Sequence, residues 1–256
     1  MSTADKFGGT MSRLLSAACG CTALLMHTVA FAQSGDVPDW VYGDGELPEK
    51  WSVTNEAYGA CDAGAMQSPI DLAETNARGD ISLSASYGVA EGKLKLGPRK
   101  VQVDVGPGMG MISGERLYSL LQMHFHTPAE HVLHDKRYPL VVHLVHGSQK
   151  GHFAVLGVAF EEGEANPALQ PIIDAMEANR SAFEFDVAKL VPDDLSVYRY
   201  MGSLTTPPCT EGVNWHVADN VLTASPEQIA MFVSRLGNSN RSLQPVNNRL
   251  VVGPEG

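Results

Sequence analysis

Four segments between residues 101 and 160 carry the hydrophobic pattern of β-strands, and this run limits the fold more than any other feature. Residues 101–105 (Val-Gln-Val-Asp-Val) alternate apolar and polar side chains with a period of two. Residues 117–126 and 140–146 contain further alternating runs, and 153–160 is a continuous apolar segment between glycines, as in a buried strand. The pattern predicts a mainly β fold.

Two helices carry start signals. Asn166-Pro167 is predicted to open one, because apolar residues follow it at helical spacing. Ser225 and Gln228 form a predicted capping box around a proline at the first helical position, and Gly237 is a suitable end. Helices are few, so we expect them at the periphery of a single β domain.

The N-terminus has the composition of an export signal. Lys6 and Arg13 precede an uncharged stretch, residues 14–32, which ends in Ala-Phe-Ala. We therefore predict a signal peptide over 1–32, a cut before Gln33, a mature domain over 33–256 and a periplasmic or secreted protein. The alternatives are a membrane anchor, for which the uncharged run is long enough, and a lipoprotein modified at Cys19. No later segment is predicted to span a membrane.

The mature chain is acidic, with a net charge of about −12. The predicted signal removes two of the 18 basic and one of the 29 acidic residues. Nucleic-acid binding is disfavoured, because phosphate contacts need clustered lysine and arginine. An acidic, solvated surface that keeps an exported protein in solution is the simpler interpretation.

Two cysteines, Cys61 and Cys209, remain after cleavage. An exported protein with one remaining pair favours one disulfide, and the alternative is two buried free thiols.

The clearest chemical signal is the His-x-His pair His124 and His126. On a strand both imidazoles point to one face, which suits a zinc chelate, although such a pair alone is weak evidence. His143 lies in another strand pattern and completes a three-histidine face if the two strands pair. His146 then points to the opposite face, and His131, beside Glu130, is interpreted as a buried hydrogen-bonding residue.

Several spaced motifs resemble the α-class carbonic anhydrases, in particular secreted bacterial members. The likeness runs from about Trp40 to Arg249. The matching segments are 67–70 (Gln-Ser-Pro-Ile), 122–126, 129–131, 143–146, 200–215 and 244–249, together with Trp40, Tyr42 and Trp51.

This resemblance implies a large, twisted, mostly antiparallel central sheet, with Zn²⁺ on His124, His126 and His143 and hydration of CO2 to bicarbonate by zinc-bound hydroxide. Thr205 matches the residue that accepts a hydrogen bond from that hydroxide, and Glu130 matches the carboxylate that accepts from the threonine. The other implied residues are Gln122 beside His124, Thr206 as a bicarbonate contact, the disulfide pair Cys61 and Cys209, and the apolar CO2 wall of Val145, Val155, Leu204, Val213 and Trp215.

Two positions depart from the family pattern. Arg99 stands where the family has its proton-shuttle histidine, and an arginine does not deprotonate near neutral pH. Val141 stands where the family usually has a glutamate that accepts a hydrogen bond from the third ligand. We therefore expect weak proton export and a weakened hold on His143.

Three functions are weighed at this point. The first is a CO2 hydratase, the second a non-catalytic relative that only holds zinc, and the third an esterase or other zinc hydrolase. Because non-catalytic relatives generally lose a zinc ligand and all three histidines are present here, the hydratase is favoured. The choice between a monomer and a homodimer stays open.

Overall fold

A computed structural model describes residues 39–43 and 49–255 of the chain. The predicted signal peptide lies outside the described residues. In the described part, no helix is long and apolar enough to cross a membrane.

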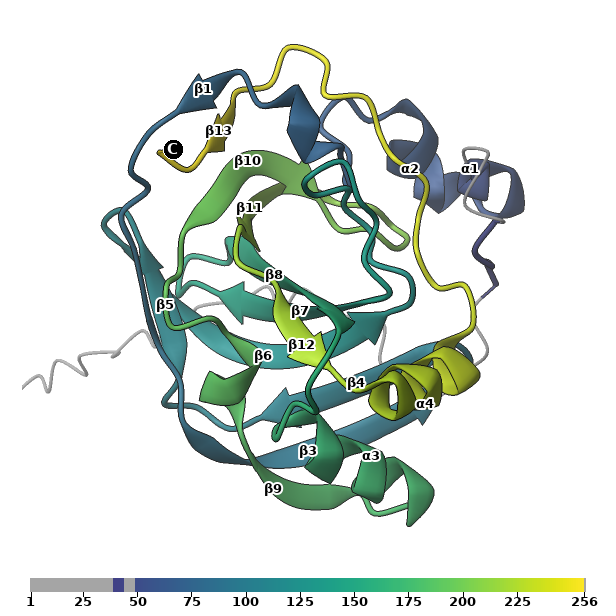
Figure 1. Cartoon of the computed structure of the whole chain (residues 1–256). Helices are drawn as coiled ribbons and strands as arrows, with labels where there is room; N and C mark the ends of the chain where they lie inside the picture. The colour runs from purple at the N-terminus through teal and green to yellow at the C-terminus, as the bar shows by residue number, and fades with distance from the viewer. Residues whose placement is uncertain (1–38, 44–48, 256) are drawn as a thin grey trace, which may run out of the picture. The chain divides into compact units, whose positions relative to one another are not determined.

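A large mixed sheet dominates the fold (Figure 1). Its continuous order is β1-β13-β10-β11-β8-β7-β6-β4-β3-β9, while β12 joins β8, and β5 joins β6 and carries β2. The strand bounds are β1 Ala77–Arg78, β2 Leu83–Ser86, β3 Val89–Gly97, β4 Lys100–Val105, β5 Gly110–Ser113, β6 Arg116–His126, β7 Leu140–Gly147, β8 Phe153–Glu162, β9 Ala182–Asp186, β10 Val197–Ser203, β11 Glu211–Ala218, β12 Leu222–Ala224 and β13 Val251–Gly253.

Most neighbouring strands are antiparallel, as expected. The pairs β1–β13, β8–β11 and β8–β12 are parallel. The four strand segments read from the sequence are β4, β6, β7 and β8, of which β6, β7 and β8 are neighbours in the middle of the sheet and β4 lies beside β6.

The short helices lie around this sheet. Their bounds are α1 Trp51–Thr54, α2 Gly59–Ala63, α3 Leu169–Glu177 and α4 Pro226–Leu236, with 3₁₀ turns at Glu56–Tyr58, Leu72–Glu74 and Val187–Leu190. The capping box predicted for α4 is confirmed: the Ser225 hydroxyl accepts from Gln228 N, and the Gln228 side chain accepts from Ser225 N. The helix predicted at Asn166 begins at Leu169, since the Asn166 side chain instead accepts a hydrogen bond from Ala168 N.

Two apolar cores lie on opposite faces of the central strands. Val142 and Leu144 of β7 belong to the larger core, which the buried sides of α3 and α4 also join. Val141 and Val145, in alternate positions of the same strand, belong to the second core together with Trp215. The strand period of two thus sends successive β7 side chains into different surroundings, and His143 points to the same side as Val141 and Val145.

Candidate metal centre

Three histidines from two adjacent strands meet on one face of the sheet. His124 and His126 point the same way along β6, and β7 pairs with β6 so that His143 lies directly opposite His124. The pairing that the sequence analysis assumed is therefore present. The candidate ligand nitrogens of the three rings lie within 4.8 Å of one another.

The rings are packed closely; His126 and His143 are buried, and His124 is half-buried. Ring centroids are 5.1 Å apart for His124 and His126, 5.3 Å for His124 and His143, and 4.8 Å for His126 and His143. Burial, reinforced by the neighbouring rings, holds the pKa of His124 and of His143 well below the usual histidine range. These two imidazoles are therefore neutral, which leaves each with one nitrogen lone pair.

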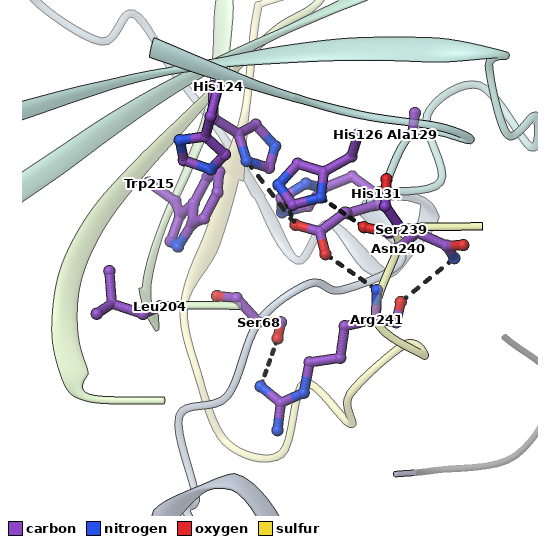
Figure 2. A network of polar contacts seen from close by, with 12 residues as sticks. Ser68, His124, His126, Ala129, His131, Leu204, Trp215, Ser239, Asn240 and Arg241 are labelled. Atoms are coloured by element: carbon purple, nitrogen blue, oxygen red, sulfur yellow. Dashed lines mark hydrogen bonds and ion pairs between the residues drawn. The ribbon is translucent and has the colours of Figure 1, made fainter. Parts of the chain in front are cut away.

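Hydrogen bonds orient two of the three rings. His124 Nδ1 lies 3.0 Å from Gln122 Oε1, in the place that the resemblance implied. His126 Nδ1 lies 2.6 Å from the Ser239 carbonyl oxygen (Figure 2). Because a carbonyl only accepts, His126 carries its proton on Nδ1 and its Nε2 is left with a free lone pair. Sequence reasoning missed Ser239, since nothing in the local sequence links it to a histidine on a distant strand.

Glu130 lies immediately behind the rings and is fully buried. Its Oε1 accepts from Arg241 N at 3.0 Å. Its Oε2 lies 3.6 Å from His126 Nε2 and 3.8 Å from His143 Nδ1. The nitrogens that converge are thus Nε2 of His126 and Nδ1 of His143, while His143 Nε2 is buried without a hydrogen-bond partner.

The hydrogen bond expected between Thr205 and Glu130 is not formed in this structure. Glu130 Oε2 accepts no hydrogen bond, although Thr205 is itself buried. The carboxylate oxygen lies instead beside ring nitrogens of the cluster, His126 Nε2 and His143 Nδ1.

Arg241 is a second residue that the sequence analysis did not single out. Its buried guanidinium donates from Nη1 to the Ser68 carbonyl (Figure 2). Nη1 also donates to Gln67 Oε1, and Nη2 donates to the Cys61 carbonyl. Its backbone N–H holds Glu130. One residue therefore joins the carboxylate behind the cluster to the segment that contains Cys61, a link between distant positions that no local pattern could reveal.

The predicted disulfide between Cys61 and Cys209 is present, with Cα atoms 5.0 Å apart at a sequence separation of 148. It anchors the loop that carries Thr205 and Thr206, where Cys209 N donates to the Thr206 carbonyl. This loop leads into β11.

The residues predicted to form an apolar wall are brought together. All five belong to or pack against the core on the histidine side of the sheet, and the Trp215 ring lies 4.9 Å from the His143 ring. Trp215 Nε1 donates to the Ser203 carbonyl, which fixes the indole. The wall is Val145, Val155, Leu204, Val213 and Trp215.

Arg99 and Val141, the two positions that depart from the family pattern, differ in their exposure to solvent. Arg99 is exposed in the turn between β3 and β4, with φ 49°, and its Nη1 donates to the Asn238 carbonyl at 3.1 Å. Val141 is buried on β7, on the same face as His143. His131, interpreted as a buried hydrogen-bonding residue, pairs through Nε2 with the Tyr200 hydroxyl at 2.7 Å.

The chain also matches known proteins. The family model described as eukaryotic-type carbonic anhydrase matches residues 46–253. A carbonic anhydrase of Pectobacterium carotovorum is 35% identical over 236 residues, which cover 89% of this chain and 96% of that protein.

Further relatives include a solved structure and a protein of another name. The α-carbonic anhydrase of Thermovibrio ammonificans, solved with the inhibitor sulfanilamide, is 34% identical with a TM-score of 0.76, covering 83% of this chain and 98% of that one. Dioscorin DB3S of Dioscorea polystachya is 33% identical over 246 residues, or 89% of this chain and 92% of that protein. From the matched length and the shared fold we conclude that this chain belongs to the eukaryotic-type, or α, carbonic anhydrase family, a family of lyases.

Proposed function

We propose that this protein catalyses the reversible hydration of CO2 to bicarbonate and a proton, with zinc held by His124, His126 and His143. The observation that carries the proposal is the convergence of three histidine nitrogens within 4.8 Å of one another on one face of the sheet. The relatives named carbonic anhydrase support it.

The donor set fits zinc. Nitrogen ligands suit this ion, and His126 Nε2 and Glu130 Oε2 are buried polar atoms that no protein group satisfies. Zinc with three neutral ligands keeps its full double charge, and when bound it supplies a Lewis acid that lowers the pKa of a coordinated water.

The protein's own residues provide the remaining requirements. The apolar wall beside the cluster suits CO2, an apolar molecule. Trp215 and Val145 of this wall belong to the core on the histidine side of the sheet. We assign Thr205 to orient the attacking oxygen, Thr206 to contact bicarbonate, and Glu130 to hold the Thr205 hydroxyl as an acceptor. Glu130 Oε2 accepts no hydrogen bond in this structure, so it is available to accept one from the threonine.

Transfer of the proton from the site to bulk solvent is expected to be the slow step in this enzyme. Arg99 stands at the shuttle position, where an arginine cannot act as a proton relay, and its guanidinium donates to the Asn238 carbonyl. His131 is buried, and burial, with the charge of Arg137 as the next cause, lowers its pKa to about 3, so it does not relay protons at neutral pH.

We further propose export by a signal peptide over residues 1–32, with the mature chain in the periplasm or outside the cell. The disulfide supports this destination, because disulfides persist in oxidising compartments.

The test is a CO2 hydration assay on the purified mature chain, with and without a strong chelator, followed by zinc addition. We expect activity that the chelator removes and zinc restores, with one zinc per chain by metal analysis. A chain that binds zinc but does not hydrate CO2 would be a non-catalytic zinc holder. Zinc-dependent ester hydrolysis without CO2 hydration would favour a hydrolase.

A further inference from the structure

The outer nitrogen of His143 separates this ring from the other two of the cluster. His124 Nδ1 and His126 Nδ1 have oxygen partners at 3.0 Å and 2.6 Å. His143 Nε2 is buried and has no partner.

The surroundings of this nitrogen are apolar. Val141 lies two residues before His143 on the same face of β7. Gly157 lies directly opposite on β8, where an added Cβ atom would be 3.8 Å from His143 Nε2. The centroid of the Trp215 ring lies 4.9 Å from the centroid of the His143 ring. None of these side chains offers an oxygen acceptor.

The inner nitrogen has the opposite environment. His143 Nδ1 faces Glu130 Oε2 at 3.8 Å, and that carboxylate oxygen accepts no hydrogen bond. A neutral imidazole carries one proton, on either Nδ1 or Nε2. A proton on Nδ1 is attracted by the carboxylate, whereas a proton on Nε2 is a buried donor without an acceptor, which is unfavourable.

Ligation requires the less favourable arrangement. A metal bound to Nδ1 needs the lone pair of that atom, so the ring proton must sit on Nε2. The proton count of the ring stays the same, since the proton leaves Nδ1 and one is taken up on Nε2.

We propose that His143 rests with its proton on Nδ1 in the metal-free protein, and that Val141 and Gly157 limit zinc affinity because they leave the metal-binding tautomer unpaired. This inference rests on the proposed zinc site and assigns two residues a positioning role toward it. An acceptor placed beside Nε2 is therefore expected to tighten zinc binding.

The first test compares Val141→Glu with Val141→Met. A carboxylate only accepts, so it pairs with the Nε2 proton and favours the metal-binding tautomer alone, while methionine controls for side-chain size. We expect the zinc dissociation constant, measured by competition with a chromophoric chelator, to fall about 10–100-fold in Val141→Glu, the range typical of an outer partner of a ligand. Val141→Met is expected to stay close to the natural chain.

A second pair guards against a Val141→Glu chain that does not fold. Gly157→Ser and Gly157→Ala place the same Cβ at ordinary contact distances from the His143 ring, 3.5 Å from Cδ2 and 3.8 Å from Nε2. Only serine adds a hydroxyl. The gain in zinc affinity of Gly157→Ser over Gly157→Ala is expected to be smaller than the gain in Val141→Glu, because a hydroxyl can pair with either tautomer.

The tautomer itself is visible by ¹⁵N NMR of the histidine side chains, with His143 identified by its absence in His143→Ala. We expect the proton on Nδ1 in the zinc-free natural chain and on Nε2 in the zinc-loaded chain. A zinc-free ring protonated on Nε2, or equal affinities within both variant pairs, would overturn the inference. Failure of the natural chain to bind any zinc would instead refute the proposed metal site.

Discussion

His143 and His146 lie three residues apart on β7 and are both buried, yet they face opposite sides of the sheet. On one side, His143 lies opposite His124 of β6, and its ring joins a cluster. On the other side, His146 lies opposite Leu120 and Ala154, and its Nε2 pairs with the Tyr87 hydroxyl at 2.9 Å.

A second histidine on the far side follows the same pattern. His216 of β11 pairs through Nε2 with the Ser113 hydroxyl at 2.9 Å. The residue type and strand setting are alike on the two sides, so what makes one side a candidate metal centre is the strand register, which places three histidine rings next to each other. On the far side the Nε2 of each ring pairs with a hydroxyl instead, that of Tyr87 between β2 and β3 for His146 and that of Ser113 in β5 for His216.

The largest expected difference comes from removing one ring on each side. His143→Ala is expected to abolish zinc binding and CO2 hydration, since only two ligands remain. His146→Ala is expected to keep one zinc per chain and to lose about 1–3 kcal/mol of stability, because the half-buried Tyr87 hydroxyl loses its partner. Metal analysis, the hydration assay and chemical denaturation check both. Loss of zinc in His146→Ala, or full activity in His143→Ala, would contradict the division of the two faces.

The histidine side is also braced covalently through the loop that bears Thr205. Opening the Cys61–Cys209 disulfide, which spans a separation of 148 residues, is expected to cost roughly 4–5 kcal/mol in the chain-entropy model. The melting temperature is then expected to fall by roughly 10–15 °C.

Thermal unfolding of the purified chain with and without reductant measures this effect, and the Cys61→Ser/Cys209→Ser double variant is the matched control, since reductant should not change its melting temperature. Two free thiols in the native protein would contradict the Cys61–Cys209 disulfide.

The far side is expected to contribute to the loss of stability at low pH. Burial, followed by the charge of Arg199, lowers the pKa of His216 to about 3. The unfolded chain takes up a proton there below pH about 6.5, whereas the folded chain does not until about pH 3, so this contribution is complete above 6.5 and declines as the pH falls. It amounts to about 2 kcal/mol lost between pH 6.5 and 5.

Denaturant unfolding in chelator at pH 7 and pH 5 tests this, with His216→Gln as the comparison. The variant is expected to be less stable at pH 7 but to lose less stability on acidification. An equal loss in both chains would show that the buried imidazole on the far side does not set the acid response.

The smallest effect concerns the rate at which the histidine side exports protons. Arg99→His is expected to raise kcat at low buffer concentration about tenfold, because a histidine accepts and releases protons near neutral pH. The backbone at position 99 is left-handed, with φ 49° at Arg99, and histidine tolerates this conformation.

Stopped-flow hydration at several imidazole concentrations checks this prediction. Buffer is expected to raise kcat of the natural chain while kcat/KM stays nearly constant, since attack on CO2 precedes proton export. A natural chain whose rate does not depend on buffer would point to another proton path.

Strand periodicity in the sequence was enough to predict β4, β6, β7 and β8 and the common face of His124 and His126. It also separated His143 from His146, because a period of two sends them to opposite faces. The cap of α4 followed from side-chain chemistry within four residues. These features are local, so neighbouring residues determine them.

Only the tertiary structure decided which distant groups meet. The contacts of Ser239 with His126 and of Arg241 with Glu130 join segments far apart in the chain. It also directed Glu130 Oε2 at the imidazoles rather than at Thr205. Hydrogen bonds and burial at these positions are set by the packing of separate strands and loops, and no pattern of neighbouring residues encodes that packing.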